Sequence, residues 1–153
     1  MENKRHIIVQ SRQLLFLGVL LFLFGLIDGL FIPMMTNPRM GLAAHLEGTM
    51  NGMFLVILGL IWHVVLVQKK WLTFTFWLTV YGSFANFTAV FLGALTGAGK
   101  LMPIAGGKES TSVYEGIISF LLISLSLAMV FVCVVVLTGL YRHIKQTPDE
   151  AAE

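Results

Sequence analysis

The sequence has little charge and almost no cysteine, and each shortage argues against a class of protein. Charged residues make up 12% of the 153 residues, about half the share that is usual in a soluble domain. The only cysteine, Cys133, lies in an apolar run, so an intramolecular disulfide and a zinc site of paired cysteines are excluded. The net charge of +2 is spread over gaps between apolar runs. It forms no basic face, which argues against a nucleic-acid partner.

Familiar catalytic and binding motifs are missing as well. The sequence contains no Walker phosphate loop, no glycine fingerprint for dinucleotides and no His-Glu-x-x-His zinc motif. No apolar segment carries the run of charges that marks a voltage sensor or an ion pathway. A function must therefore depend on isolated polar residues within apolar segments.

What the sequence has instead is four apolar runs, each long enough to cross a bilayer, which takes about 20 residues. We predict helices over residues 14–33, 42–67, 71–95 and 113–141, with a glycine-rich loop over 96–112. The runs lack the period-2 pattern of barrel strands. The predicted fold is an all-α integral membrane protein, a four-helix up-down-up-down bundle forming one domain over residues 1–145. Residues 146–153 are expected to be a disordered polar tail.

The distribution of lysine and arginine predicts the orientation of this bundle, because cytoplasmic loops carry an excess of these residues. One side of the predicted bundle carries Lys4, Arg5, Arg12, Lys69, Lys70, Arg142 and Lys145, and the other carries Arg39, Lys100 and Lys108. The richer side contains both chain ends. We therefore expect the N and C termini to lie in the cytoplasm.

A small set of polar side chains lies within the apolar runs, where each is energetically costly. The rise of about 1.5 Å per helical residue places the whole set in the half of the bundle away from the cytoplasm. Its members are Asp28, His45, Glu47, Asn51, Asn86 and Glu115. Asp28 is the hardest to explain structurally, because it needs a partner or a proton and the nearest cation in sequence is Arg39. The convergence of the set predicts a functional site.

Several of these residues also have a purely structural interpretation. A lone histidine near a helix end, such as His45, is more often an interfacial hydrogen-bonding residue than a metal ligand. Asn51 and Asn86 would serve as hydrogen-bonding residues between helices. Glu115 at a helix start is explained by the helix dipole. The residue types alone leave both interpretations open.

Glycines on the second predicted helix share one face with His45. Gly41, Gly48, Gly52 and Gly59 follow helical spacing around it. Small residues let a second helix approach closely, and Gly48-x-x-x-Gly52 is a familiar packing motif. The same groove would also admit a flat macrocycle beside a histidine ligand, although the spacing by itself favours helix packing.

Residues 37–52 read Asn-Pro-Arg-Met-Gly-Leu-Ala-Ala-His-Leu-Glu-Gly-Thr-Met-Asn-Gly. This run resembles the signature of bacterial hydroxylaminobenzene mutases, and the resemblance extends to the four-helix layout and the loop at residues 103–106. Members of that family convert N-phenylhydroxylamines to 2-aminophenols in the degradation of nitroaromatic compounds, without consuming redox equivalents. The resemblance implies an isomerase with an apolar aromatic hydroxylamine substrate, embedded in the lipid of the bacterial inner (cytoplasmic) membrane as a multi-pass protein.

A weaker resemblance links the chain to styrene oxide isomerase, through His45, Asn51-Gly52-Met53 and Ala85-Asn86. That family implies a homotrimer with haem b at the subunit interfaces. It also implies that His45 is the axial ligand of the iron and that Asn51 lies near the same haem. The glycine groove at Gly48 and Gly52 would then line the cofactor.

The chain departs from styrene oxide isomerase on the third helix. Aligned on Ala85-Asn86, the aspartate and the tyrosine of that family are replaced by Gly82 and Val90. The departure favours mutase chemistry over epoxide isomerisation, which stays as the alternative activity.

These observations give a mechanistic hypothesis with ferric haem b at His45 acting as a Lewis acid. Asn51 and Asn86 are expected to orient the substrate or the departing oxygen. Glu47, Asp28 or Glu115 is expected to transfer the proton, and the sequence does not distinguish among the three.

Two other hypotheses remain beside this one. In a haem-free mutase, Asp28 and Glu47 would protonate the hydroxylamine directly. In a non-enzymatic protein, the four helices would form a transport subunit or a haem-binding electron carrier. An electron carrier would need a second axial ligand, for which Met50 or Met53 of a neighbouring chain is available.

Overall fold

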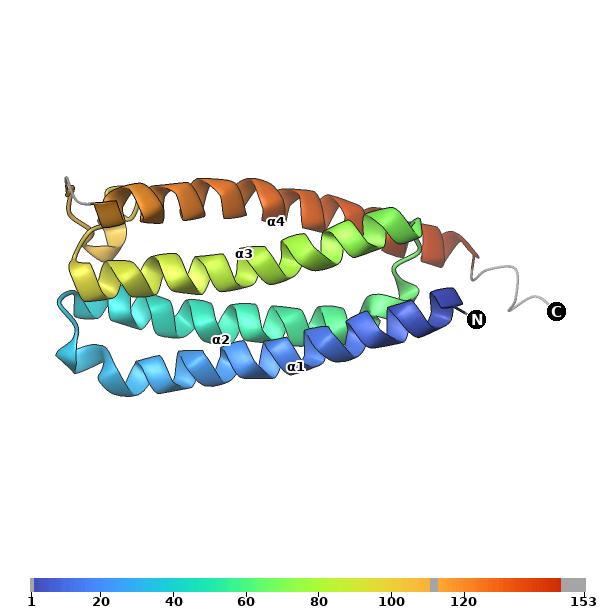
Figure 1. Ribbon diagram of the computed structural model, residues 1–153, viewed down its shortest axis with the longest axis horizontal. Helices are drawn as coiled ribbons and strands as arrows, with labels where there is room; N and C mark the ends of the chain where they lie inside the picture. The colour runs from blue at the N-terminus through green and yellow to red at the C-terminus, as the bar shows by residue number, and fades with distance from the viewer. Residues whose placement is uncertain (1, 111–112, 147–153) are drawn as a thin grey trace.

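The structure, a computed structural model, describes residues 2–110 and 113–146. Four long helices dominate it, α1 (Glu2–Phe31), α2 (Pro38–Ile61), α3 (Lys69–Thr96) and α4 (Val113–Gln146) (Figure 1). Short 3-10 turns form η1 (Ile32–Met34), η2 (Trp62–Val64) and η3 (Pro103–Ala105). Each long helix is sufficiently long and apolar to cross a membrane. The all-helical fold class is therefore confirmed, as is the prediction of four helices able to span a membrane.

The helices differ in length from the apolar runs that predicted them. α1 begins at Glu2 rather than at residue 14, and α4 continues to Gln146 rather than ending at residue 141. Hydropathy detects only the apolar part of a helix, whereas hydrogen bonding continues into polar flanks. α2 ends at Ile61, before the expected residue 67, and continues into η2. The predicted tail over 146–153 lies outside the described residues apart from Gln146.

Local sequence explains where two of the helices begin and end. Asn37 caps α2, since its side chain accepts a hydrogen bond from the amide of Met40, and Pro38 occupies the first turn, where it needs no backbone donor. α3 ends at Gly97, whose φ of 76° is the left-handed conformation that favours glycine. The amide of Gly97 donates to the carbonyl of Gly93 over 2.8 Å.

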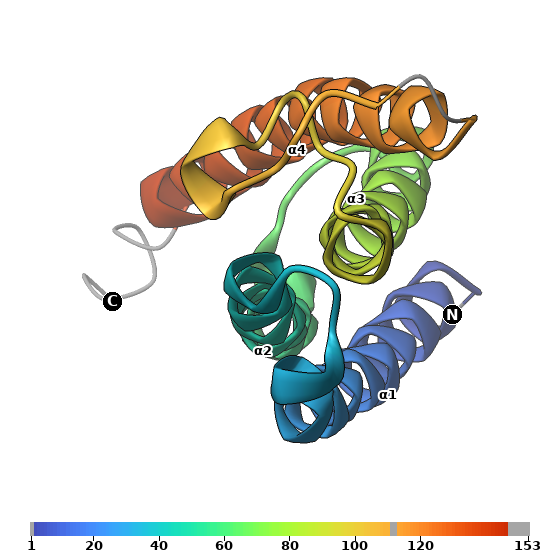
Figure 2. The same cartoon turned by 90° about the vertical axis from the view of Figure 1, so that its left-hand side faces the viewer.

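The four helices do not close into a ring. α1 packs on α2, α2 on α3, and α3 on α4, whereas α1 and α4 share no contact within the described residues (Figure 2). Accordingly, 22% of the residues in the apolar spans of α1 and α4 are buried, against 39% in α2 and 44% in α3. The two outer helices therefore present broad apolar surfaces to the surroundings of the bundle.

Glycines bring α1 and α2 into close contact. A Cβ atom on Gly48 would lie 2.6 Å from the Cα of Gly25, and one on Gly52 would lie 2.7 Å from the carbonyl oxygen of Gly18. α1 thus fills the glycine face of α2. Of the two interpretations of that face, these contacts describe helix packing, and they do not support the expectation that Gly48 and Gly52 line a cofactor.

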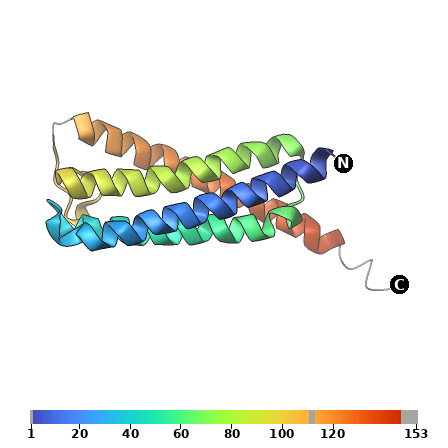
Figure 3. The same cartoon turned by 60° about the horizontal axis from the view of Figure 1, so that its bottom comes forward.

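α1 crosses its neighbours obliquely, as Figure 3 shows. Near its start, a hydrogen bond of 2.9 Å joins His6 to Thr73 of α3. Farther along, Gly25 packs on Gly48 of α2. The end of the bundle that carries residues 32–37 and 97–110 is called the loop end below. α1 contacts α3 at few positions, and a cavity separates the two helices near the loop end.

Candidate functional site

The polar residues predicted from the sequence all lie in the half of the bundle next to the loop end, but they do not form one cluster. Hydrogen bonds and burial divide them into three groups. The groups are Glu47 with Asn51 and Asn86, His45 with Asp28, and Glu115 with the loop backbone.

The first group joins α2 to α3 through one carboxylate oxygen. Oε2 of Glu47 accepts hydrogen bonds from Nδ2 of Asn51 at 2.9 Å and from Nδ2 of Asn86 at 2.5 Å. The Asn51 amide also donates to the backbone carbonyl of Glu47. Asn51 is buried, so these bonds satisfy amide groups that water does not reach. Both asparagines therefore orient the Glu47 carboxylate.

The second group is built around the imidazole of His45. Its Nδ1 lies 2.8 Å from the backbone carbonyl oxygen of Gly25 in α1. A carbonyl only accepts, so Nδ1 is the donor in this bond, and Nε2 is the ring nitrogen that is left for another partner. A Cβ atom on Gly29 would lie 2.7 Å from Nδ1. Gly25 and Gly29 thus form a notch in α1 that seats the ring and fixes its tautomer.

Asp28 lies beside this notch, because it directly precedes Gly29, which packs against the His45 ring. Only 4% of its surface is exposed. Within the described residues, neither carboxylate oxygen of Asp28 has a hydrogen-bond partner. Arg39, the nearest cation in sequence, does not pair with it and instead lines a surface hollow with Gly106 and Lys108. Asp28 is therefore buried with its hydrogen-bonding capacity unused.

Asp28 lines a cavity of about 490 Å³ between α1 and α3. Three phenylalanines form a stacked wall of this cavity. The ring centroids of Phe24 and Phe87 are 6.4 Å apart, and those of Phe87 and Phe91 are 5.7 Å apart. Every other residue that lines the cavity is apolar. These phenylalanines were not predicted from the sequence, because they lie on two helices and only the tertiary structure shows which faces of those helices meet.

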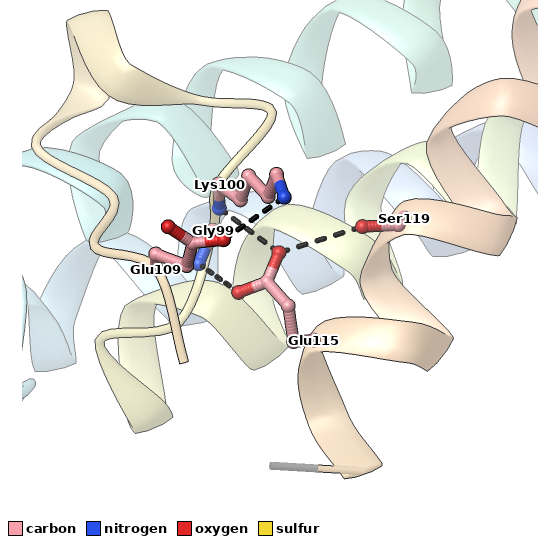
Figure 4. A network of polar contacts seen from close by, with 5 residues as sticks. All are labelled: Gly99, Lys100, Glu109, Glu115 and Ser119. Atoms are coloured by element: carbon pink, nitrogen blue, oxygen red, sulfur yellow. Dashed lines mark hydrogen bonds and ion pairs between the residues drawn. The ribbon is translucent and has the colours of Figure 1, made fainter. Parts of the chain in front are cut away.

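Glu115 forms the third group, in which it bonds to backbone amides of the loop (Figure 4). Its Oε2 accepts from the amide of Gly99 at 3.1 Å, and its Oε1 accepts from the amide of Lys100 at 3.0 Å and from Ser119 at 3.4 Å. Within the described residues, no hydrogen bond links this group to Glu47. These contacts support a structural role, in which Glu115 holds the glycine-rich loop over the start of α4.

An exposed ion pair completes this loop. Nζ of Lys100 lies 2.9 Å from Oε1 of Glu109, and both side chains are largely exposed. The hydrogen bond and the charge of Glu109 raise the pKa of Lys100, and the reverse interaction lowers the pKa of Glu109. Both groups therefore stay charged near neutral pH, outside the apolar spans.

The donors in the part of the chain that the structure describes are compatible with one axial ligand to a macrocycle, and they do not form a ligand set for a bare metal ion. Within residues 2–110 and 113–146, no three His, Cys, Asp or Glu side chains gather to hold a metal. A haem needs only an axial protein donor, because the macrocycle supplies the in-plane donors. His45 fits this role, since ligating histidines usually donate their other ring nitrogen to a carbonyl or carboxylate, as Nδ1 does to Gly25. The notch was not predicted, although the spacing Gly25-x-x-x-Gly29 is typical of a close helix contact.

Comparison with known proteins decides the family. The profile of the styrene oxide isomerase family matches residues 10–141. The chain belongs to the styrene oxide isomerase family. All three polar groups lie within the residues that the family profile matches. No solved structure matches the chain.

Two relatives of this chain are hydroxylaminobenzene mutases of Ectopseudomonas oleovorans. Hydroxylaminobenzene mutase HabB is 50% identical over 132 residues, covering 85% of this chain and 80% of the relative. Hydroxylaminobenzene mutase HabA is 47% identical over 127 residues, covering 82% of this chain and 94% of the relative. By this identity the chain belongs with the hydroxylaminobenzene mutases, and both resemblances seen in the sequence are confirmed.

Proposed function

We propose that the chain is a membrane-bound hydroxylaminobenzene mutase, an isomerase that converts N-phenylhydroxylamine to 2-aminophenol. The identity of about half of all aligned residues with two proteins of that name supports the activity. The membrane-spanning helices suit an apolar aromatic substrate that partitions into lipid. The observation that carries the assignment within the structure is the oriented imidazole of His45 next to the unbonded carboxyl group of Asp28.

We infer that the helices cross the bacterial inner membrane in up-down-up-down order, with both chain ends in the cytoplasm. In Figure 1 the start of α1 and the end of α4 lie at the same end of the bundle, opposite the loop end. That end carries most of the lysines and arginines, as positive-inside orientation requires. The polar groups then lie in the half of the membrane away from the cytoplasm.

The reaction places three demands on the site. The N–O bond breaks and an oxygen bond forms at the ortho carbon of the ring. The proton of that carbon leaves, and the nitrogen gains one proton, so the product is an isomer of the substrate and no electrons enter or leave. The site must therefore weaken the N–O bond, bind the ring and move one proton.

We propose that His45 is the axial ligand of haem b, which when bound supplies a Lewis acid for the N–O group. The carbonyl of Gly25 orients the imidazole for this role, and Gly29 leaves space for the ring. We further propose a homotrimer with haem at the subunit interfaces. The open packing, in which α1 and α4 do not meet, leaves apolar helix faces for neighbouring copies.

Within the site, we propose that Asn51 and Asn86 act through Glu47 as positioning residues. Both amides donate to the same carboxylate oxygen, so they fix the side chain of Glu47 rather than remaining free for the substrate. Glu47 also lines a separate hollow of about 470 Å³ with Leu46 and Met102. The cluster keeps α2 and α3 in register next to the His45 helix face.

An absorption spectrum and a product assay test this proposal directly. Detergent-purified wild type, His45→Ala and His63→Ala would be compared by absorption, pyridine haemochrome assay and conversion of phenylhydroxylamine to 2-aminophenol. His63 is a matched control, because it is exposed in η2, just beyond the end of α2 that lies away from the loop end. We expect a Soret band and turnover in wild type and His63→Ala, and loss of both in His45→Ala.

Other results would redirect the proposal in defined ways. A colourless wild type that still forms 2-aminophenol would remove haem and favour acid catalysis by Asp28 and Glu47. A protein with haem that isomerises styrene oxide but not phenylhydroxylamine would favour the epoxide isomerase. A coloured protein that turns over neither substrate would support a haem carrier instead of an enzyme.

A further inference from the structure

The cavity between α1 and α3 has the properties of a ligand site. Its volume is about 490 Å³, within the range of roughly 300 to 1,000 Å³ that is common for small-molecule pockets. His45 does not line it, but Gly29, the residue after Asp28, packs against the His45 ring, so the cavity lies beside the proposed haem ligand. Exposed Phe31 and Met34 contribute to its lining, so the cavity opens on an apolar surface of the bundle. An apolar ligand would enter it sideways, from lipid.

The wall of this cavity suits a flat aromatic ring. Phe24, Phe87 and Phe91 form a continuous stack, with interplanar angles of 26° between the first two rings and 12° between the last two. Aromatic rings attract further aromatic rings in offset or edge-on contacts at such distances. Phe24 is 40% exposed, which leaves part of the stack uncovered for another ring.

Asp28 is the single polar residue among the described residues that line the cavity. Its two oxygens have no partner within the described residues, although the side chain is almost completely buried. An unsatisfied buried polar group is energetically unfavourable, and more so when it is charged. Glu47 and Glu115, the other two candidates for proton transfer, are both already hydrogen-bonded. A carboxyl group keeps an acceptor oxygen whether or not it is protonated, so Asp28 is available for a ligand that donates.

We propose that this cavity is the substrate subsite, in which Asp28 is a catalytic residue. The phenyl ring of an aromatic hydroxylamine stacks against Phe24, Phe87 and Phe91, and its hydroxylamino N–H or O–H donates to the Asp28 carboxyl group. This assignment rests on the proposed mutase function. As the N–O bond breaks and oxygen bonds to the ortho carbon, Asp28 takes the proton from that carbon and returns it to the nitrogen. Atoms and electrons balance without an oxidant or a reductant.

Two substitutions of Asp28 separate proton transfer from binding. Asp28→Asn keeps an acceptor oxygen but carries no proton, so we expect kcat to fall by about 100-fold or more while KM changes little. Asp28→Ala removes the acceptor as well, so KM should also rise. Glu109→Gln is the matched acidic control, because Glu109 is exposed in the loop. A residue with only a structural role would not produce this split between kcat and KM.

Two phenylalanine substitutions on α1 test the aromatic wall. Phe24→Leu should raise KM for phenylhydroxylamine several-fold, because the substrate loses one stacking partner. Phe16→Leu is the control, since Phe16 lies on α1 but is 70% exposed and outside the cavity. Equal KM values for these two variants would overturn the subsite.

Photolabelling with 3-azidoaniline gives a readout that does not depend on turnover. We expect saturable labelling of the segments 24–35 and 87–95, competed by aniline and weakened in Asp28→Ala. Labelling that is not saturable, or that is the same in wild type and Asp28→Ala, would overturn the proposal. Labelling of residues 102–105 would move the substrate to the hollow beside Glu47 and would overturn it too.

These readouts separate the failure of the subsite from the failure of the function. If wild type converts phenylhydroxylamine but Asp28→Asn and Phe24→Leu behave like their controls, the mutase stands and the subsite is wrong. If wild type is inactive but labels saturably in an Asp28-dependent manner, the cavity stands as an arylamine site and the mutase function is wrong.

Discussion

Two carboxyl groups in the same half of the bundle, the half-buried Glu47 and the buried Asp28, have opposite surroundings. Between α2 and α3, Glu47 accepts hydrogen bonds from two asparagine amides. Between α1 and α3, Asp28 has no partner within the described residues and lines an aromatic cavity. In a membrane, a polar group without an internal partner is costly. The comparison indicates that the Glu47 region holds helices together, whereas the Asp28 region retains unused hydrogen-bonding capacity for a ligand.

The largest expected loss of stability comes from breaking the Glu47 region. Glu47→Leu would leave the amides of Asn51 and Asn86 without their shared acceptor. We expect the free energy of unfolding to fall by roughly 2 to 4 kcal/mol, because the Asn86 amide loses its acceptor, at about 1 to 3 kcal/mol, and Asn51 loses one of its two hydrogen bonds, at about 1 kcal/mol. Unfolding in mixed detergent micelles measures this loss. A stability equal to that of wild type would show that the cluster does not join α2 to α3.

A second prediction disturbs the contact between α1 and α2, on which the position of Asp28 depends. A Cβ atom on Gly25 would lie 2.7 Å from the amide nitrogen of Thr49. Because backbone has to move, Gly25→Ala should destabilise the fold by about 1 to 3 kcal/mol and weaken the His45 hydrogen bond. In Gly116→Ala the new methyl group meets nothing within 4 Å, and we expect a gain of up to about 1 kcal/mol from helix propensity.

The two glycine variants are compared by the same unfolding assay and by the absorption spectrum. Gly25→Ala should change the spectrum of any His45-bound haem, whereas Gly116→Ala should not. If both variants unfold like wild type, then α1 does not pack on α2 as closely as the glycine contacts indicate.

The third prediction concerns Asp28, where we expect a substitution to raise the free energy of unfolding instead of lowering it. Asp28→Leu replaces an unpartnered buried carboxyl group by an apolar side chain, so we expect the free energy of unfolding to rise by about 1 kcal/mol. The same unfolding assay in the absence of substrate measures it. If Asp28→Leu destabilised the protein as Glu47→Leu does, Asp28 would have a structural partner and the contrast between the two regions would disappear.

The smallest effect is expected at the loop ion pair. Glu109 has a lowered pKa, so its contribution is present above the ordinary glutamate pKa and is lost as the pH falls through the lowered value. Lys100 has a raised pKa, so its contribution is lost as the pH rises through the raised value. Because both side chains are 58% or more exposed, Glu109→Gln should hardly change the unfolding midpoint at neutral pH.

A pH series of unfolding midpoints for wild type and Glu109→Gln checks this expectation. Any difference between the two proteins should vanish in acid, where Glu109 is protonated. A large difference at neutral pH would mean that the loop, and not the helix interior, controls the stability of this end of the bundle.

Much of the fold was predictable because bilayer-length apolar runs have few structural solutions. The four helices follow from those runs, although hydropathy placed the start of α1 at residue 14 instead of Glu2. The polar residues of the site were also identifiable, since each is costly in an apolar helix. Their grouping was not predictable, because spacing along one helix does not tell which neighbouring helix provides the partner. Arg39 illustrates this, as it is near Asp28 in sequence but lines a different hollow.

The sequence by itself determined that this protein is a four-helix membrane protein of a recognisable family, with a few costly polar groups in one half of the bundle. These conclusions depend on residue type and local spacing, which the chain carries directly. Only the tertiary structure decided that Glu115 holds a loop, that Glu47 is bonded by two asparagines and that Asp28 remains unbonded beside three phenylalanines. The reason is physical, since a hydrogen bond or a cavity wall needs groups from different helices to meet, and the packing of those helices fixes which groups do.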